Sequence, residues 1–265
     1  MLEKSLFNSG YLYAAFGKQY IDEATISAKS LKSIDPHAHI TIVSDVPVQD
    51  PVFDHWIEYN LTGGEHWKLG LMGKIEGLIR TPYEQTVFLD TDTYVVSPVS
   101  ELFKLLAFFD FCLAMAPADL SPAIINGSPL EGLSCYNTGV IAFRKNLRTM
   151  QFLSDWEEDY SSKLEEYSGD QPSFMRILTK SDIKVHVLQQ HYNARTNLAI
   201  ALPGAPVKIL HGRHRNFVQI AERINRSTKN RHWCPIIQDL ISIGPSFTSL
   251  KLGMQCLKRV VRGPQ

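Results

Sequence analysis

The chain has 265 residues, 44% of them hydrophobic and 20% charged, and its 27 Lys and Arg balance its 27 Asp and Glu. This length can bury one substantial core or two abutting halves, and the composition excludes a disordered or fibrous chain. No apolar stretch reaches transmembrane length, and the first residues lack the basic-then-apolar order of a signal peptide, so we expect a cytoplasmic location.

Strand and helix patterns alternate along most of the chain. In chain order the sequence predicts a strand over 11–16, a helix over 21–31, strands over 39–43 and 56–59, a helix over 68–80, a strand over 86–89, a helix over 98–106, strands over 109–116 and 137–143, helices over 147–164 and 172–178, and strands over 184–188 and 207–210. This alternation favours a mostly parallel sheet with helices on both faces. The loop over 118–134, rich in Pro, Gly and Ser, is the best internal boundary, and we expect an irregular chain after 210 until a last helical stretch.

One strand pattern is interrupted by two carboxylates. Residues 87 to 96 read VFLDTDTYVV, so Asp90 and Asp92 stand inside an apolar run. A strand buried on both faces excludes charge unless it is paired or metal-bound, so we expect both aspartates at the carboxyl end of this strand. Side chains two residues apart point to one side and can chelate Mg²⁺ or Mn²⁺. On the motif alone, a loop of solvated aspartates stays an open alternative.

Other phosphate-handling motifs fit the chain less well. It has neither a Gly-x-x-x-x-Gly-Lys-Ser/Thr loop nor a Gly-x-Gly-x-x-Gly fingerprint, so a phosphate would be held in some other way. Aspartyl phosphatases of the haloacid dehalogenase type also carry Asp-x-Asp, with the first Asp attacking phosphorus. Their motif has Thr or Val two places after the second Asp, where this chain has Tyr94, and it usually opens the first strand. The chain resembles them only in part.

Five segments occur in the order found in one glycosyltransferase family. They are YLYAAFGKQYIDEATISAKSL at 11–31, Lys74 sixteen residues before Asp90 and followed by FLDTDTYV, YNTGVIAF at 136–143, GDQPSF at 169–174 and VKILHGRHRNF at 207–217. Together they resemble the nucleotide-sugar glycosyltransferases with an Asp-x-Asp motif and a GT-A fold. Within these, the chain is most similar to the retaining glycogenin and lipooligosaccharide galactosyltransferase family, which is glycosyltransferase family 8-like.

The resemblance implies a GT-A fold and an activity. The expected catalytic domain is 1–220, with a nucleotide-sugar-binding half over about 1–117 and an acceptor half over 135–220, followed by a basic extension over 221–265. The implied activity is metal-dependent, retaining transfer of a hexose from a UDP-sugar to an acceptor hydroxyl, with a glycan or glycolipid as the acceptor. A nucleotide-sugar hydrolase or phosphoryl-transfer enzyme with the same metal site, and a non-catalytic protein that binds sugar nucleotides or glycans, remain alternatives.

The resemblance also implies roles for particular residues. The metal ligands for Mn²⁺, or Mg²⁺, would be Asp90, Asp92 and His211. Asp170 and Gln171 would flank the transferred sugar. Residues expected to bind the nucleotide sugar are Ala14, Ala15, Phe16, Gly17, Tyr20, Lys74, Thr91, Asn137 and Thr138. Two carboxylates and an imidazole are also a suitable ligand set for Mn²⁺ on chemical grounds.

The stretch after His211 departs from the family pattern. The family usually has glycine three places and lysine six places after this histidine, whereas here Gly212 follows it directly. Arg213 or Arg215 is the plausible replacement for the lysine that clamps the diphosphate, because a guanidinium suits bidentate phosphate contacts.

Each assignment has a purely structural alternative. His211 could be a histidine satisfied at a strand end, and Lys74 a solvated helix lysine. Asp170 could cap a helix, since Pro172 fits a first helical turn. Further alternatives are strand termination for Asn137 and Thr138, and a place in the core for Tyr20.

The last part of the chain is basic. From Lys208 onward there are 11 Lys and Arg against 2 Asp and Glu. Within 248–262, one helical stripe would be apolar, with basic residues on the other faces; its members are Leu250, Met254, Leu257 and Val261. This segment is expected either to dock on the body of the protein or to contact an anionic membrane peripherally. No nucleic-acid partner is expected.

Overall fold

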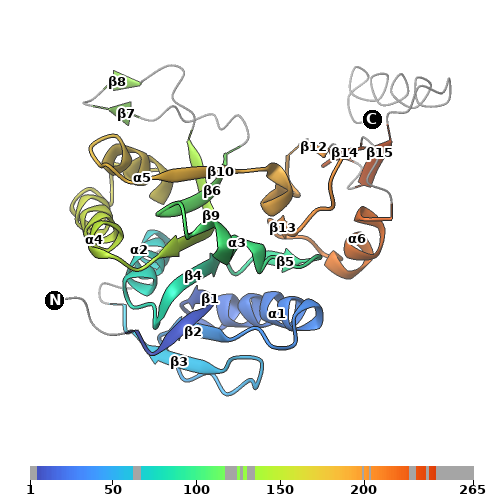
Figure 1. The fold of residues 1–265 in the computed structure, drawn as a ribbon, viewed down its shortest axis with the longest axis horizontal. Coiled ribbons are helices and arrows are strands. Elements are labelled where there is room, and N and C mark those ends of the chain that lie inside the picture. Colours follow the sequence, from blue (N-terminus) through green and yellow to red (C-terminus); the bar gives the residue numbers. More distant parts are fainter. Residues whose placement is uncertain are drawn as a thin grey trace.

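The computed structural model describes residues 5–61, 67–116, 124–125, 128–129, 135–198, 200–202, 204–226, 231–236 and 239–242. Its elements, shown in Figure 1, are β1 (Phe7–Ala15), α1 (Lys18–Ile34), β2 (Ile40–Ser44), β3 (His55–Glu58), α2 (Trp67–Ile79), β4 (Tyr83–Leu89), β5 (Thr93–Val95), α3 (Glu101–Leu105), β6 (Phe111–Met115), β7 (Ile124–Ile125), β8 (Ser128–Pro129), β9 (Tyr136–Arg144), α4 (Leu147–Ser162), α5 (Asp170–Leu178), β10 (Val185–Leu188), the 3-10 helix η1 (Gln190–Tyr192), β11 (Ala194–Arg195), β12 (Ile200–Leu202), β13 (Ile209–His211), α6 (Phe217–Ile224), β14 (Arg231–Cys234) and β15 (Asp239–Ser242).

The predicted strands and helices up to residue 210 are all present, with shifted ends. The expectation of an irregular chain after 210 is wrong, because α6, β14 and β15 follow. The domain boundary expected at 220–221 falls inside α6, and β14 pairs with β12. The helix expected within 248–262 lies outside the described residues.

A mixed sheet of seven strands forms the centre of the molecule. Its order is β10-β6-β9-β4-β1-β2-β3, and β9 alone runs antiparallel to its neighbours β4 and β6. The prediction of a mostly parallel sheet is therefore confirmed. Because β9 is reversed, its first residues lie at the edge where the parallel strands end. There, the Asp90 amide donates to the Gly139 carbonyl over 2.8 Å.

Helices cover both faces of this sheet, which explains its apolar strands. Along β1, Tyr11, Tyr13 and Ala15 point into the core under α1 and α3, whereas Leu12 points into the core under α2, α4 and α5. Figure 1 shows α1 on one side of the sheet and α2, α4 and α5 on the other. The period-two alternation of a strand delivers side chains to both cores at once.

A second, smaller sheet brings the segment that ends at His211 to this edge. Its order is β11-β13-β5, and the antiparallel register of β13 with β5 pairs His211 with Thr93. The Gly212 amide then donates to the Asp92 carbonyl over 3.0 Å. A third core of apolar residues, including Leu202, Leu210 and Trp233, packs behind these strands. The smaller sheet therefore fixes His211 beside the turn that follows β4.

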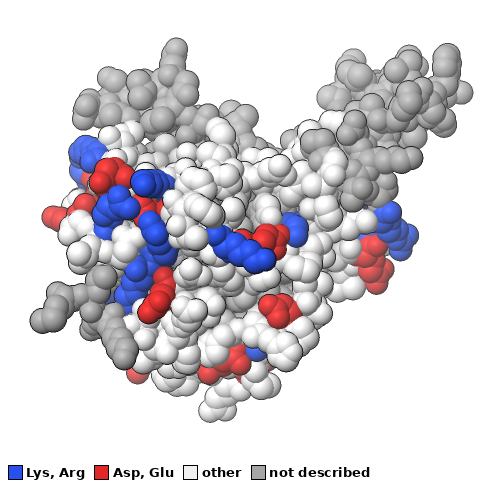
Figure 2. Space-filling model, viewed as in Figure 1, with Lys and Arg blue, Asp and Glu red and all other residues white. Residues whose placement is uncertain are grey.

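Charged side chains of both signs lie next to one another on the face shown in Figure 2. Asp159 binds both Lys163 and Arg176, at 2.7 and 3.2 Å, and Arg148 binds the fully buried Asp110 at 3.1 Å.

Among the residues that the structure describes, no helix is both long and apolar enough to cross a membrane.

Candidate active site

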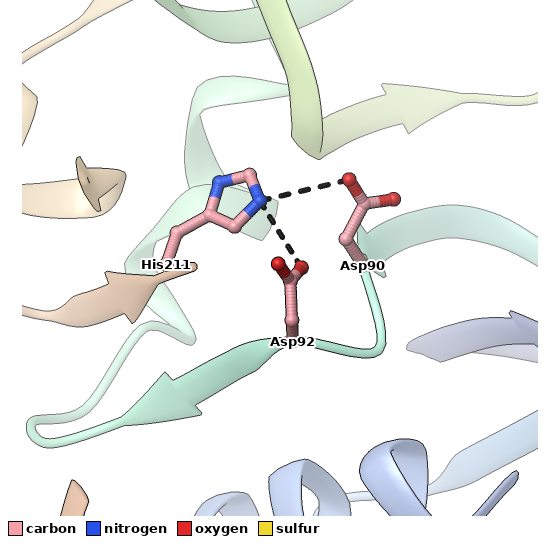
Figure 3. Close-up of side chains that lie close together, drawn as sticks. All are labelled: Asp90, Asp92 and His211. Carbon is pink, nitrogen blue, oxygen red and sulfur yellow. Dashed lines mark ion pairs between the residues drawn. The ribbon is translucent and has the colours of Figure 1, made fainter. Parts of the chain in front are cut away.

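Three side chains converge where β4 ends. Asp90 follows β4 directly, Asp92 precedes β5, and His211 ends β13. His211 Nε2 lies 3.7 Å from Asp90 Oδ2 and 3.3 Å from Asp92 Oδ1 (Figure 3). The two aspartates stand at the carboxyl end of the strand as expected, but a turn, closed by the Thr93 amide on the Asp90 carbonyl at 3.2 Å, brings them together. One ligand atom from each of the three residues lies within 4.8 Å of the others.

A hydrogen-bond chain sets the tautomer of His211. The Gly139 backbone amide donates to Asn137 Oδ1 over 3.0 Å, which fixes the orientation of the Asn137 side-chain amide. Asn193 Nδ2 donates to the same oxygen over 2.7 Å, so Asn193 Oδ1 faces His211 Nδ1 at 2.6 Å. An oxygen can only accept, so Nδ1 carries a proton and Nε2 is the ring nitrogen that faces the two carboxylates. Metal-binding histidines are held in this way.

The charges at this triad fit a divalent cation. Burial raises the pKa of Asp90, against the opposing effect of Lys74. Burial also acts to raise the pKa of Asp92, but the hydrogen bond and charge of His211, with Arg213 and Arg195, outweigh it and lower that pKa to about 2. A cation at the triad would favour the ionised form of both carboxyls. Two carboxylate oxygens and a neutral imidazole nitrogen form a donor set suited to Mn²⁺.

Lys74 links this triad to α5. Its ammonium is buried and lies 3.1 Å from Asp90 Oδ1 and 3.0 Å from Asp170 Oδ2. The Thr138 hydroxyl accepts from Lys74 over 3.1 Å and donates to Asp170 Oδ2 over 2.8 Å. Burial acts to lower the pKa of Lys74, but the charges of Asp170 and Asp90 raise it overall. The alternative of a solvated helix lysine is therefore wrong.

Asp170 and Gln171 begin α5 at the same edge. Gly169 occupies the N-cap position, so the alternative that Asp170 caps the helix is wrong. The buried Asp170 side chain turns toward Lys74 instead. The carbonyl of Asp170 accepts from Trp156 Nε1 over 3.2 Å, so α4 positions this end of α5. The side-chain oxygen of Gln171 is shielded from solvent and has no hydrogen-bond partner among the described residues.

The end of β1 carries the residues expected to line a nucleotide. Ala14 and Ala15 close the strand, followed by Phe16 and then Gly17, whose φ of 86° is a conformation that favours glycine. The Gly17 amide donates to Asp45 Oδ1 over 3.0 Å. Tyr20, in the first turn of α1, is 37% exposed, so it is not a core residue.

A pocket of about 420 Å³ lies beside Asp92. Arg213 and Arg215 both line it, together with Thr91 and Glu23. The larger cavity, about 860 Å³, lies between α4 and the chain after α5, and the triad residues do not line it. The chemistry of the site therefore belongs to the smaller pocket.

Three residues near the triad escaped the sequence reasoning. Asn193 acts through hydrogen bonds, and Gly139 acts by leaving room for His211 and Asp90. Neither effect has a local sequence pattern, although Gly139 falls inside the quoted YNTGVIAF. Glu23 had a weak signal: it stands three residues after Tyr20 and so shares its helix face. Glu23 accepts from the Thr91 hydroxyl over 3.0 Å.

Gly139→Ala should disable the metal site. A Cβ at this position would overlap His211 Cε1 and lie 2.8 Å from Asp90 Oδ2, so two ligands would have to move. We expect Mn²⁺ affinity to fall by at least about 10-fold, as when the support of a metal ligand is lost. Titration of Mn²⁺ followed by calorimetry measures this. Gly70→Ala is the control, because a Cβ there meets nothing within 4 Å. Equal Mn²⁺ affinity in the two variants would contradict the assignment.

Comparisons with known proteins agree with this geometry. A family model described as nucleotide-diphospho-sugar transferase matches residues 85–231, more than half of the chain and a range that contains the triad. Human glycogenin-2 is 30% identical over 176 residues, which cover 60% of this chain and 32% of glycogenin-2. The chain thus aligns with about a third of the length of this curated relative.

Two solved structures share the fold. The glycosyltransferase GlyE of Streptococcus pneumoniae TIGR4 has a TM-score of 0.55 at 18% identity, covering 79% of this chain and 56% of GlyE. The galactosyltransferase LgtC, solved in complex with donor and acceptor sugar analogs, has a TM-score of 0.56 at 15% identity, covering 82% of this chain and 94% of LgtC. The protein therefore has the GT-A fold and belongs to the nucleotide-diphospho-sugar transferase family.

Proposed function

We propose that the protein transfers a hexose from a UDP-sugar to an acceptor hydroxyl, with a divalent metal held by Asp90, Asp92 and His211. The observation that carries this proposal is the convergence of one ligand atom from each of these three side chains within 4.8 Å, with His211 Nε2 facing both carboxylates. When bound, the metal would supply positive charge that stabilises the departing diphosphate. Mn²⁺ is the ion that this donor set favours.

The donor would lie across the edge of the large sheet. Tyr20 would stack on the base, and the segment from Ala14 to Gly17 would line the nucleoside. Arg213, with Arg215 beside it, would bind the diphosphate, because a guanidinium offers several N–H donors in one plane. Thr91 would hold the metal turn to α1 through its hydroxyl. The donor half would comprise about 1–117.

The transferred sugar would lie between the triad and α5. The Lys74 ammonium lies 3.0 Å from Asp170 Oδ2 and orients this carboxylate, which can accept from sugar hydroxyls. The unpartnered oxygen of Gln171 is a second acceptor for them. Asn137 orients Asn193, which in turn holds His211, and the Thr138 hydroxyl donates to Asp170. The acceptor half would comprise 135–220.

We propose retention of the anomeric configuration. Asp170 Oδ2 is held by Lys74 and Thr138, which disfavours it as a nucleophile. The acceptor oxygen would instead attack the anomeric carbon from the face that the diphosphate leaves. The bond from that carbon to the phosphate oxygen breaks, and the acceptor proton passes to the departing diphosphate, which gives UDP and the glycoside. A glycan or glycolipid is the proposed acceptor, and the cytoplasm is the proposed location of the protein.

Release of UDP tests this proposal against its alternatives. UDP-glucose, UDP-galactose and UDP-N-acetylhexosamines are incubated with the protein and Mn²⁺, with and without a panel of glycan acceptors. A transferase releases UDP faster when one acceptor is present, and EDTA stops the release. Equal release without acceptor indicates a nucleotide-sugar hydrolase. Binding of the sugar nucleotide without any release indicates a binding protein, and both results would overturn the proposal.

Tyr20→Ala should weaken UDP binding in Mn²⁺ by about 1 kcal/mol, the order of one lost aromatic stack. Tyr20→Phe keeps the ring and should bind UDP as the parent does, which makes it the matched control. Calorimetry with UDP and with pyrophosphate separates the base from the phosphates, and only UDP binding should change. An unchanged UDP affinity in Tyr20→Ala would show that the ring does not contact the base.

A further inference from the structure

Glu23 joins three segments that meet at the donor pocket. It lies on α1, and its carboxylate accepts from Arg213 Nε over 2.7 Å and from Arg213 Nη2 over 3.2 Å. The same carboxylate accepts from the Thr91 hydroxyl over 3.0 Å, in the turn that carries the two metal-ligand candidates. The Glu23 side chain is 20% exposed, against 60% for Arg213. In the proposed function Glu23 only accepts the hydrogen bond from Thr91, and its contact with Arg213 has no task.

The backbone places Arg213 beside the triad but does not by itself fix the conformation of its side chain. Gly212 has a φ of 112° and donates its amide to the Asp92 carbonyl over 3.0 Å, so the start of this loop is fixed. A long side chain on such a loop loses rotamer entropy when it is ordered. Glu23 orders the guanidinium before any ligand binds, and the ring of Tyr20 lies 5.8 Å from it.

The contact with Glu23 uses only one edge of the guanidinium. Arginine has five N–H donors in a rigid plane. Nε and one hydrogen of Nη2 point at Glu23, so Nη1 and the second hydrogen of Nη2 form a second edge, for which no hydrogen-bond acceptor is found among the described residues. This side chain borders the pocket of about 420 Å³ that Thr91 and Asp92 also line. A parallel pair of N–H donors matches two oxygens of a phosphate group.

We propose that Glu23 is a positioning residue for the diphosphate: it holds Arg213 by one edge and presents the other edge to the phosphates beside Asp92. This inference rests on the proposed function. It differs from a sequestering role, in which Glu23 would compete with the phosphates for Arg213. The two roles predict opposite effects of removing the carboxylate.

A double-mutant cycle on UDP binding in Mn²⁺ tests the proposal by calorimetry. Glu23→Ala and Arg213→Ala should each weaken UDP binding about tenfold, the effect of one lost charge-assisted contact, and the double variant should be no weaker than either. Glu23→Gln keeps an acceptor without the charge and should fall between Glu23→Ala and the parent. Asp22→Ala is the matched control, because Asp22 is the neighbouring residue of α1 and pairs with the exposed Lys18.

Several outcomes would overturn this role for Glu23. Tighter UDP binding by Glu23→Ala would show sequestration. Additive losses in the double variant would show that Glu23 acts independently of Arg213, as a residue needed only for folding would. Unchanged UDP affinity in Glu23→Ala, with the parent binding normally, would refute the inference alone. Failure of the parent to bind UDP in Mn²⁺ would refute the proposed function and this inference with it.

Discussion

Asp92→Asn should abolish Mn²⁺-dependent binding of UDP and leave the fold intact. The substitution removes a charge and one of two oxygens from the site that His211 Nε2 faces at 3.3 Å. Loss of a direct ligand should cost more than the roughly 10–100-fold that loss of an outer partner costs. Asp92 is partly exposed and lies in a turn, so its packing contribution is small. Because the charge contacts that lower the pKa of Asp92 are lost, we expect the unfolding midpoint to fall by no more than about 8 °C, which is roughly 2 kcal/mol in a chain of this size.

Calorimetry of UDP with Mn²⁺ and circular dichroism of the apo protein measure the two halves of this result. Asp182→Asn is the control, because it makes the same chemical change at a side chain that is 82% exposed. UDP binding in Mn²⁺ as tight as that of the parent would mean that Asp92 is not a metal ligand. Loss of the folded spectrum would mean that the carboxylate has a structural role instead.

Lys74→Met should destabilise the protein by about 3–5 kcal/mol, as removal of one partner from a buried ion pair does. Methionine keeps the length of the side chain but leaves Asp90 and Asp170 without the cation that lies 3.1 and 3.0 Å from them. Denaturant unfolding at neutral pH measures the loss. Lys18→Met is the control, because the Lys18 side chain is 87% exposed. An unfolding midpoint of Lys74→Met equal to that of the parent would show that the ion pairs of Lys74 do not stabilise the fold.

The loss in Lys74→Met should depend on pH. Burial already raises the pKa of Asp90, and without Lys74 this pKa should rise further. A carboxyl whose pKa is raised on folding costs stability above that pKa, and the cost disappears as the group is protonated. The stability difference between parent and variant should therefore shrink as the pH falls from about 7 to about 5. A constant difference over this range would show that the carboxylates are not the cause.

Much of the fold could be predicted because long elements carry their own pattern. The apolar runs that became β1, β4 and β9 and the amphipathic α4 are long enough for periodicity to be read. The elements missed before residue 210 all have three residues or fewer and form no pattern of their own; they are β5, β7, β8, β11, β12 and η1. The strands β5 and β11 form because β13 pairs with them, and β12 forms because β14 does; such pairing between distant segments is a long-range property.

The site residues that belong to a sequence motif could be predicted, whereas those brought to the site only by folding could not. The Asp-x-Asp motif and the resemblance named Asp90, Asp92 and His211, which the fold brings together. Local capping rules offered Asp170 as a helix cap, but its contact with buried Lys74 overrides them. Asn193 sets the His211 tautomer through a partner distant in sequence, and only the folded chain reveals it.

The central claim is that Asp90, Asp92 and His211 together hold the metal that binds the diphosphate. A crystal of the protein grown with UDP and MnCl₂, measured at the manganese absorption edge, tests it most directly. We predict one anomalous peak in contact with all three side chains and with the phosphates of UDP. Bound UDP with no anomalous peak among these side chains, or with the peak elsewhere, would contradict the account.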